Sequence, residues 1–277
     1  MIGKKVRERC LPEAVIWIPM VETWFQNESY SRNHAVGLWQ LIPATARNFG
    51  LRIDEWVDER LDPEQSTDTA LQVLDYLHDK LGDWLLALAA YNAGEGCVNR
   101  AIDQTGSRDY WVLARQRALP SQTRFYVAAV LALAEIGRDP AKHDVNFPPN
   151  APVIMDRVPV GPQISLRQIA ALSGITLQEL RRLNPSLKRS WTPTGNEPFN
   201  LCIPAGSREP VLSALNEPDS FSSGDLVVHI IQPGDTLSDL AHAYQSTIDA
   251  IMAVNQLKHH IIIAGREILI PAGLNWN

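Results

Sequence analysis

Apolar residues in the first half of the chain recur every three or four positions, which is the spacing of amphipathic helices. The pattern predicts a mostly helical region over residues 11–137. One helix is expected to begin at Pro12 and to kink at Pro19, because proline lacks an amide hydrogen and crowds the preceding turn. Another helix is expected over Thr67–Leu81, where the aliphatic side chains share one stripe.

Two later segments predict helices of different kinds. Trp84–Ala90 is apolar on every side, as in a helix buried within a core, and Gly94 is expected to end it. Ser121–Ile136 is amphipathic, and we expect Ser121 to cap its amino end and Gly137 its carboxyl end. The first half therefore predicts a helical domain.

The second half contains a repeat. Residues 165–206 and 236–273 share their order of polar and apolar positions, and both copies close with Ile-Pro-Ala-Gly. Each copy predicts strand, helix, helix and strand, since apolar runs typical of strands flank two short helical patterns. Residues 147–152 and 216–224, which are rich in proline or in serine, aspartate and glycine, predict linkers before the two copies.

The charge balance narrows the possible partners. The 277 residues carry a net charge of −6, so neither a broad nucleic-acid-binding surface nor a polybasic membrane patch is expected. No apolar run approaches the roughly 18 residues of a transmembrane helix. The three cysteines show no CxxC spacing, and His259-His260 lacks partner ligands at a recognisable spacing. We therefore expect no disulfide framework, no metal and no cofactor.

Glu22 is the candidate for acid–base chemistry. It lies between apolar residues on a predicted helix, with Ile18 four positions before it and Phe25 three after it. Loss of hydration there raises the pKa of a carboxyl group and keeps it protonated near neutral pH, as a general acid for glycosidic cleavage requires. The pattern alone also fits a structural glutamate.

Four motifs occur in a fixed order. Val21-Glu22-Thr23 is followed by GLWQLIPAT over residues 37–45, AAYNAGEG over 89–96 and QTRFYV over 122–127. Together they resemble the lytic transglycosylases with a goose-type-lysozyme-like catalytic domain, in particular the membrane-bound D type. The resemblance covers roughly residues 11–206 and continues through the C-terminal module.

The resemblance implies an activity and a set of site residues. Such enzymes cleave the β-1,4 bond between N-acetylmuramic acid and N-acetylglucosamine in peptidoglycan without water, and they leave a 1,6-anhydro ring. The family's catalytic glutamate corresponds to Glu22, and Thr23 stands where serine is usual. The substrate-binding residues that the resemblance implies are Ser31, Gln40, Tyr91 and Tyr126. Trp39 and Tyr91 offer aromatic faces for stacking of a sugar ring, and Asn92 is a further candidate for substrate binding. Packing or capping is the alternative role for Ser31, Trp39, Gln40 and Tyr91.

One carboxyl group can serve this reaction as acid and then as base. Protonated Glu22 would donate to the leaving oxygen, the muramoyl N-acetyl carbonyl would stabilise the anomeric carbon, and Glu22 would then accept the proton of the O6 hydroxyl. Ser31 is expected to hold the acetamido group. A hydrolytic muramidase would need a second acid, for which the acidic run Asp54–Asp62 is a candidate, although it is typical of a solvated face or a capping set. A non-catalytic peptidoglycan-binding protein is the alternative from another class.

Residues 228–272 resemble a LysM module, a carbohydrate-binding unit of cell-wall proteins. The resemblance implies a groove for N-acetylglucosamine chains, and capping of a helix is the alternative role for Asp235 and Thr236. The earlier copy lacks the Pro-Gly-Asp-Thr turn, so packing against the catalytic domain is there the alternative to sugar binding. The implied groove residues are Gly234, Asp235, Thr236 and Leu237, with Ile262 and Ile263 opposite.

The expected architecture is α+β and multidomain. A mostly helical, lysozyme-like catalytic domain over residues 1–145 precedes a degenerate LysM-like unit over 153–206 and a LysM module over 226–273. The expected ligand is the glycan strand of peptidoglycan, and the resemblance implies the periplasm or cell envelope, with association to the membrane. Prolines and a glutamate interrupt the apolar stretch after Leu11, so no signal peptide is predicted in this sequence.

Overall fold

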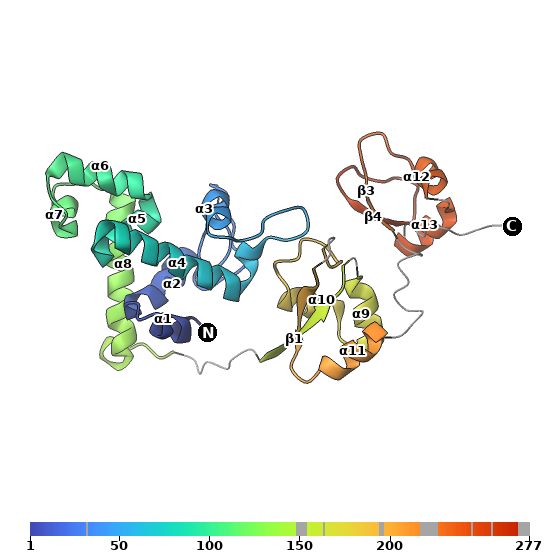
Figure 1. Ribbon diagram of the computed structural model, residues 1–277, viewed down its shortest axis with the longest axis horizontal. Coiled ribbons are helices and arrows are strands. Elements are labelled where there is room, and N and C mark those ends of the chain that lie inside the picture. Colours follow the sequence, from blue (N-terminus) through green and yellow to red (C-terminus); the bar gives the residue numbers. More distant parts are fainter. Residues whose placement is uncertain are drawn as a thin grey trace.

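The structure is a computed structural model that describes residues 1–31, 33–147, 154–162, 164–193, 197–216, 227–244, 246–255 and 257–270. Within these residues, three large hydrophobic cores define a helical domain and two small α/β units, which lie in a row in chain order (Figure 1). The predicted α+β organisation is confirmed. The predicted linkers lie almost entirely outside the described residues, and the predicted domain limits stay predictions.

In the described part of the first domain the regular elements are helices, and the chain between them forms isolated antiparallel bridges. Pro19 does not kink one continuous helix as predicted, because a 3₁₀ helix ends at Trp17 and Pro19 lies in the first turn of the next helix, where no amide hydrogen is needed. The elements are α1 (Ile2–Glu8), η1 (Glu13–Trp17), α2 (Ile18–Thr23), α3 (Pro43–Asn48), η2 (Glu59–Leu61), α4 (Pro63–Leu81), α5 (Trp84–Ala93), α6 (Glu95–Thr105), α7 (Tyr110–Arg115), α8 (Ser121–Arg138) and η3 (Pro140–His143).

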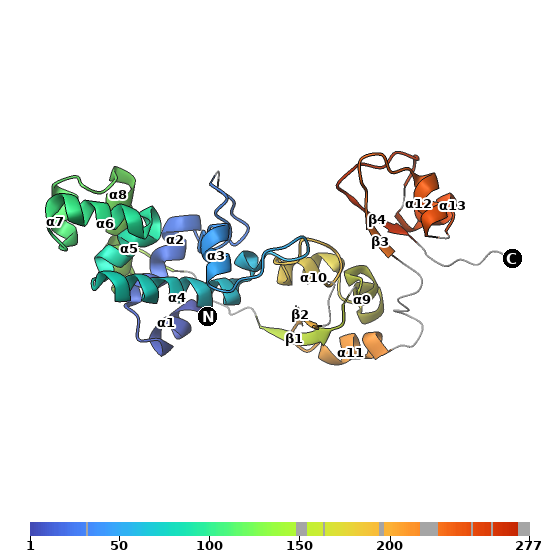
Figure 2. The same ribbon diagram turned by 45° about the horizontal axis from the view of Figure 1, so that its top comes forward.

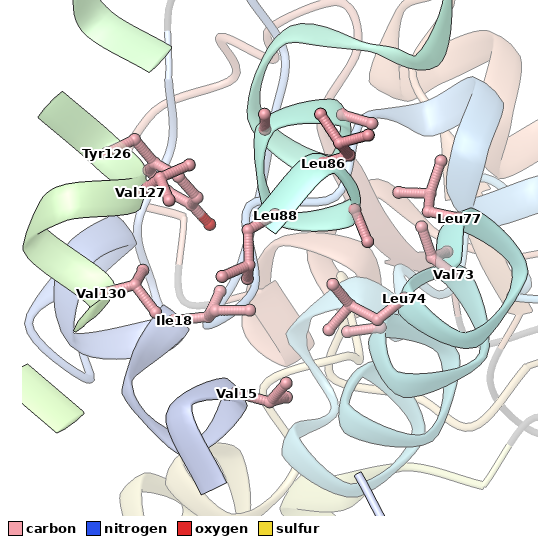
Figure 3. Close-up of a cluster of buried hydrophobic side chains, with 14 of the residues drawn as sticks. Val15, Ile18, Val73, Leu74, Leu77, Leu86, Leu88, Tyr126, Val127 and Val130 are labelled. Atoms are coloured by element: carbon pink, nitrogen blue, oxygen red, sulfur yellow. The ribbon is translucent and has the colours of Figure 1, made fainter. Parts of the chain in front are cut away.

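The core of this domain lies between α4, α5 and α8. Leu74 of α4 and Leu86 of α5 are fully buried, and Ile18 of α2 and Val130 of α8 are packed into the same cluster (Figure 3). As predicted, α5 is apolar around its circumference and ends at Gly94, whose φ of 85° is a conformation that favours glycine. Because α5 is buried in the core, the positions of the polar residues at its C-terminal end are fixed.

α8 begins at Ser121 as predicted, but both predicted caps are wrong. Pro120, rather than Ser121, precedes the first turn, and no side chain caps it. Gly137 lies inside the helix, where Trp17 packs against it: a Cβ atom at position 137 would come within 1.9 Å of the Trp17 ring. Glycine serves here to allow close packing and not to end a helix.

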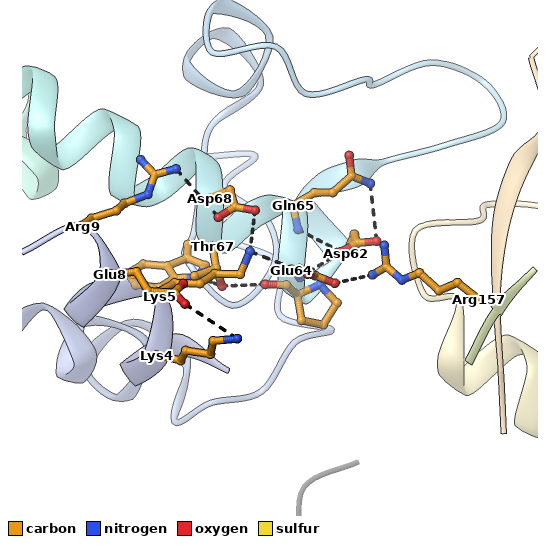
Figure 4. A network of polar contacts seen from close by, with 12 residues as sticks. Lys4, Lys5, Glu8, Arg9, Asp62, Glu64, Gln65, Thr67, Asp68 and Arg157 are labelled. Carbon is orange, nitrogen blue, oxygen red and sulfur yellow. Dashed lines mark hydrogen bonds and ion pairs between the residues drawn. The ribbon is translucent and has the colours of Figure 1, made fainter. Parts of the chain in front are cut away.

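A polar seam attaches α1, which the sequence pattern did not predict, to α4. Lys5 Nζ lies 2.5 Å from Asp68 Oδ2 and 3.7 Å from Glu64 Oε1, and Arg9 lies 3.8 Å from Asp68 (Figure 4). Arg9 also lies 3.6 Å from Asp75. In the described part of the chain, no helix is long and apolar enough to cross a membrane.

The two small units share the predicted order of strand, helix, helix and strand. In each, the two strands pair antiparallel (Figure 2). The first unit adds a further helix, which buries Val211 in its core. The elements are β1 (Met155–Val160), α9 (Leu166–Ser173), α10 (Leu177–Leu183), β2 (Phe199–Pro204) and α11 (Arg208–Asn216), followed by β3 (Val227–Ile230), α12 (Leu237–Ala243), α13 (Ile248–Asn255) and β4 (Glu267–Ile270).

An asparagine clamp repeats in both units. The Asn184 side chain donates to the Cys202 carbonyl at 2.7 Å and accepts from the Cys202 amide at 2.8 Å. Asn255 makes the same two bonds with Leu269, at 2.6 and 2.9 Å. Each asparagine therefore ties the end of the second helix to the closing strand, which supports the duplication predicted from sequence.

Candidate active site

A cleft of about 540 Å³ opens in the helical domain, and Glu22 lies in its wall. The wall is formed by residues of α2, the loop before α3, α3, α4, the C-terminal end of α5, and the first turns of α6 and α8. It brings together side chains that are far apart in the sequence. The predicted site residues that line it are Glu22, Ser31, Gln40, Tyr91 and Asn92.

Glu22 has the electrostatics of a general acid. Burial raises the pKa of its carboxyl group from 4.5 to about 7, and a hydrogen bond with the Tyr126 hydroxyl opposes this rise. Ile18, one turn earlier on α2, is fully buried, so the helix places the carboxyl group at the edge of the core. The carboxyl group is therefore substantially protonated near neutral pH.

Tyr126 supports Glu22 and does not line the cleft. It projects from α8 into the core and is 4% exposed (Figure 3). Its hydroxyl is one of the few buried polar atoms of the described chain without a well-formed hydrogen bond, so its bond with Glu22 is imperfect. Burial and the adjacent Glu22 raise the pKa of Tyr126 well above its usual value, which keeps it a proton donor. The predicted substrate contact by Tyr126 is therefore wrong.

Tyr91 joins α5 to the loop before α3. Its hydroxyl donates to the Trp39 carbonyl at 2.8 Å. Burial raises the pKa of Tyr91 well above its usual value, and the neighbouring Glu22 carboxylate raises it further. Trp39 itself is completely buried and donates through Nε1 to Thr67 at 2.9 Å. The prediction that Trp39 offers a face for sugar stacking is wrong, because the core covers its ring.

Hydrogen bonds shape the loop over residues 29–41, the cleft loop. The Ser31 hydroxyl accepts from the Ala35 amide at 3.0 Å, which leaves its proton for a ligand. The Gln40 amide donates to the carbonyls of Ser29 and Gly37 at 3.2 and 2.9 Å, so its nitrogen holds the loop. Both side chains therefore sit in a folded loop of defined shape.

Two further hydroxyls connect the site to its surroundings. Thr23, which follows Glu22, donates to the carbonyls of Pro19 and Leu38 at 3.1 and 3.3 Å. Thr23 thereby ties α2 to the cleft loop. The hydroxyl group, which the usual serine at this position would also supply, therefore has a structural role. The Asn92 carbonyl oxygen accepts from the Thr123 hydroxyl at 3.0 Å, which links α5 to α8.

Sequence reasoning missed the residues at one end of the cleft. Tyr76 of α4 is 41% exposed, its hydroxyl donates to Glu95 at 3.3 Å, and its ring packs edge-on against Phe49 at 5.9 Å. All three line the cleft. Tyr76 lies off the apolar stripe of its helix, and an exposed aromatic residue at such a position was the one available signal.

The acidic run Asp54–Asp62 has the capping role that its pattern favoured. Asp54 accepts from the amides of Trp56 and Val57 at 2.7 and 2.8 Å, and Asp62 caps α4. None of its carboxylates lines the cleft.

The groove residues implied for the second unit are only partly at the surface. Thr236 caps α12 by accepting from the Asp239 amide at 3.2 Å. Asp235 lies 2.6 Å from His229 Nε2, and this hydrogen bond lowers the pKa of Asp235. Gly234 and Thr236 are exposed, Ile263 is 53% exposed, and Asp235 and Ile262 are half-buried. Leu237 is 3% exposed within the core, so its predicted place in the groove is wrong.

Comparison with known families agrees with this division of the chain. Residues 1–114 match the transglycosylase SLT domain, residues 154–220 the LysM-like domain of lytic transglycosylase MltD, and residues 229–271 the LysM domain. The chain therefore carries a transglycosylase SLT domain followed by two LysM-type domains, and the resemblance inferred from its motifs is confirmed.

Individual relatives extend the comparison. Membrane-bound lytic murein transglycosylase D of Escherichia coli K12 is 29% identical over 294 residues, which is 98% of this chain and 63% of that protein. A putative tributyltin chloride resistance protein of Alteromonas sp. is 46% identical over 102 residues, 36% of this chain and 49% of that one. The lytic transglycosylase Slt of Pseudomonas aeruginosa, an inactive mutant, superposes with a TM-score of 0.44 and 27% identity over 51% of this chain and 24% of that chain.

Proposed function

We propose that this chain is a peptidoglycan lytic transglycosylase, which cleaves the β-1,4 bond between N-acetylmuramic acid and N-acetylglucosamine and leaves a 1,6-anhydro end. The observation that carries the proposal is Glu22, a carboxyl group in the cleft wall whose pKa is raised to about 7. A general acid works best when its pKa lies near the operating pH. The SLT domain match over residues 1–114 supports the same reaction class.

The reaction needs one carboxyl group at two moments. Protonated Glu22 donates its proton to the glycosidic oxygen as the bond to the anomeric carbon breaks, and the N-acetyl carbonyl of the muramoyl residue stabilises the positive carbon. Glu22, now a carboxylate, takes the proton of the O6 hydroxyl while O6 bonds to the anomeric carbon. No water is consumed, and Glu22 returns to its protonated form.

The surroundings of Glu22 suit this cycle. The buried Tyr126 hydroxyl stabilises the transient carboxylate by hydrogen bonding, since it opposes the rise of the Glu22 pKa. Ser31, whose hydroxyl proton faces no acceptor among the contacts of the described residues, is suited to donate to the acetamido oxygen. Gln40 shapes the same loop and lines the same cleft.

Glu95 is the carboxylate that a hydrolytic muramidase on this fold would have to use. It and Glu22 are the carboxylates in the described cleft wall. The Glu95 carboxylate accepts from the Tyr76 hydroxyl at 3.3 Å, and Glu95 is the first residue of α6. These contacts suit a group that anchors the cleft end, and they make Glu95 the control residue for the mechanism.

Digestion of purified sacculi by the full chain tests the proposal. Mass spectrometry should find fragments with anhydro ends, each lighter by one water than the product of hydrolysis. Glu22→Gln should lower turnover by at least about 10²–10⁴-fold, since general acid–base catalysis has that value and one group performs both steps. Glu95→Gln should keep anhydro products. Reducing ends that vanish in Glu95→Gln would instead establish a two-carboxylate hydrolase, and absence of any cleavage by the parent chain would favour a binding protein.

We further propose that the chain acts in the cell envelope on the glycan strands of peptidoglycan. The LysM domain over residues 229–271 supports this location. Its exposed surface around Gly234, Thr236 and Ile263 is the expected contact with N-acetylglucosamine. A tethered binding module raises the effective concentration of the catalytic domain at the wall.

A further inference from the structure

The first LysM-like unit is joined to the helical domain by backbone pairing. The chain over residues 52–59, the 52–59 hairpin, extends from the helical domain to the unit (Figure 2). There the Asp58 amide donates to the Ser186 carbonyl at 2.8 Å and the Lys188 amide to the Trp56 carbonyl at 2.9 Å, with Val57 and Leu187 opposite each other. The loop between α10 and β2 therefore adds a short strand to the hairpin.

Side chains seal this junction. Trp56, Val57 and Trp191 are 7%, 1% and 5% exposed and form a hydrophobic cluster. The side chains that pack against this cluster come from both small units: Leu187 and Phe199 from the first, Val228 and Leu269 from the second. The Arg189 guanidinium lies 4.7 Å from the centre of the Trp56 ring, and its Nε donates to the Glu55 carbonyl at 3.0 Å. Apolar burial and a planar cation together hold the hairpin tip against the unit.

The base of the same hairpin carries a buried ion pair. Arg60 binds the Asp58 carboxylate through two nitrogens, at 2.9 and 2.7 Å, and both side chains are at most 7% exposed. Its third nitrogen donates to the carbonyls of His34 and Leu41, at 2.7 and 3.0 Å. A buried arginine with all these partners is held in one geometry.

Those two carbonyls belong to the cleft loop, which carries Ser31 and Gln40. Gly37 of this loop packs against Arg60, the residue that follows the 52–59 hairpin. The contact is so close that a Cβ atom at position 37 would lie 2.1 Å from the Arg60 carbonyl oxygen. Asn27, just before the loop, donates to the Leu61 carbonyl at 2.6 Å. The position of the cleft loop therefore depends on where the hairpin is held.

In the first unit the two loops that would border a LysM groove are bonded to each other. Thr192 donates from its amide to the Ile164 carbonyl at 2.9 Å, and its hydroxyl accepts from the Ile164 amide at 2.8 Å and donates to Gly161 at 2.6 Å. Ser165 and Trp191 form an antiparallel bridge. The described parts of the two loops are therefore held together, and the loop between α10 and β2 contacts the 52–59 hairpin.

We propose that the first LysM-like unit is a positioning element for the catalytic cleft. Its loop over residues 184–192 fixes the 52–59 hairpin, and Arg60, as a positioning residue, transmits that placement to the carbonyls of the cleft loop. Ser31 and Gln40 are thereby held for the substrate. The proposal rests on the proposed function for its catalytic consequence, but the mechanical coupling is independent of it.

Variants of the full chain test the coupling. Trp56→Ala and Arg189→Ala weaken the junction without touching the cleft, although Arg189→Ala also removes the 2.9 Å ion pair with Glu267 of the second unit, which Trp56→Ala retains. Arg167→Ala, on the exposed face of α9 in the same unit, removes the same charge as Arg189→Ala and is the matched control. Circular dichroism establishes that each variant is folded, and hydrogen exchange then reports on amides such as Val36 and Gln40, which bond within the cleft loop.

The junction variants should exchange these loop amides faster, and the control should not. On short soluble glycan oligomers, KM should rise by roughly 2- to 30-fold, the range expected when contacts remote from a site alter its coupling. The dependence of kcat on pH should stay unchanged, because neither substitution alters the α8 contact to Glu22. Arg60→Lys keeps the positive charge but cannot bind the Asp58 carboxylate through two nitrogens. It should therefore raise loop exchange and KM as the junction variants do.

Loop exchange and KM equal to the parent in both folded junction variants would overturn the proposal. Equal effects of Arg167→Ala and Arg189→Ala would also overturn it, because they would reveal general loss of stability in the unit. A parent chain without catalytic activity would contradict the proposed function alone, since the exchange experiment reads the coupling without turnover.

Discussion

Replacing Glu22 with glutamine should stabilise the protein, and only at neutral and alkaline pH. The carboxyl group has a pKa of about 7 in the folded chain because it is buried, against 4.5 for the ordinary group. The folded chain accommodates the neutral carboxyl group, so this group does not lower the free energy of unfolding of the parent below pH 4.5. As the pH rises from there to 7, the unfolded chain gives up the proton and the folded chain retains it, and stability is lost.

The size of this loss follows from the two pKa values. Each pKa unit corresponds to about 1.4 kcal/mol, so the difference between 4.5 and about 7 amounts to about 3 kcal/mol. Above pH 7 both states are ionised and the loss stays constant. Glu22→Gln has no proton to lose, so its advantage over the parent should grow from near zero at pH 4 to about 3 kcal/mol at pH 8. In a domain of this size that is roughly 6 to 12 °C in Tm.

Unfolding of the two chains in urea, followed at pH 4, 6 and 8, measures the difference directly. The parent and the variant differ at one residue, so other titrating groups cancel in the comparison. Glu95→Gln removes a carboxylate from the same cleft and is the matched control. A gain in Glu22→Gln that is the same at all three pH values would refute the reasoning, because it would arise from packing or from general charge and not from a carboxyl group with a raised pKa.

Three further predictions concern catalysis and binding. The rate on short glycan oligomers should fall about tenfold for each pH unit above 7, because the acid must start protonated; a flat profile would mean that another group supplies the proton. Tyr76→Ala should raise KM more for long oligomers than for short ones, since Tyr76 lies at one end of the cleft, and equal effects at all lengths would remove it from substrate contact. Joint replacement of Asp235 and Thr236 by alanine should weaken sacculus binding in a pull-down assay and leave the turnover of short oligomers unchanged; unaltered binding would make the second unit structural.

The parts of the fold predicted from sequence are those that local periodicity determines. The apolar stripe of Thr67–Leu81 gave the core-facing side of α4, and the all-apolar α5 was correctly placed in the core. The repeat revealed two α/β units because both copies need the same buried positions. Glu22 was found because a carboxylate on an apolar helix is a local anomaly, and the four motifs gave it a chemical context.

The failures arise where residues distant in sequence meet. Gly137 follows an apolar helix and has the local pattern of a C-cap, yet it lies inside α8, where the ring of Trp17 packs against it. Trp39 lies in a glycine-rich motif beside the cleft, yet its indole nitrogen finds Thr67, which turns the ring into the core. Tyr76 enters the cleft only because α4 passes beside Phe49. None of these contacts has a periodic signature.

The two small α/β units share one arrangement of strands and helices but differ in the surroundings of one loop. Both keep the asparagine clamp between second helix and closing strand, so the positions that define the fold are the same. They differ in the loop that follows this asparagine. In the first unit the loop carries Trp191 and Arg189, which contact the hairpin of the helical domain, and Arg189 also pairs with Glu267 of the second unit at 2.9 Å. In the second unit the corresponding loop leaves Ile261 and Ile263 exposed, at 78% and 53%. The asparagine clamp lies away from the outer side chains of both loops, so one frame can carry a loop that packs on a neighbouring domain in the first copy and a loop with exposed apolar side chains in the second.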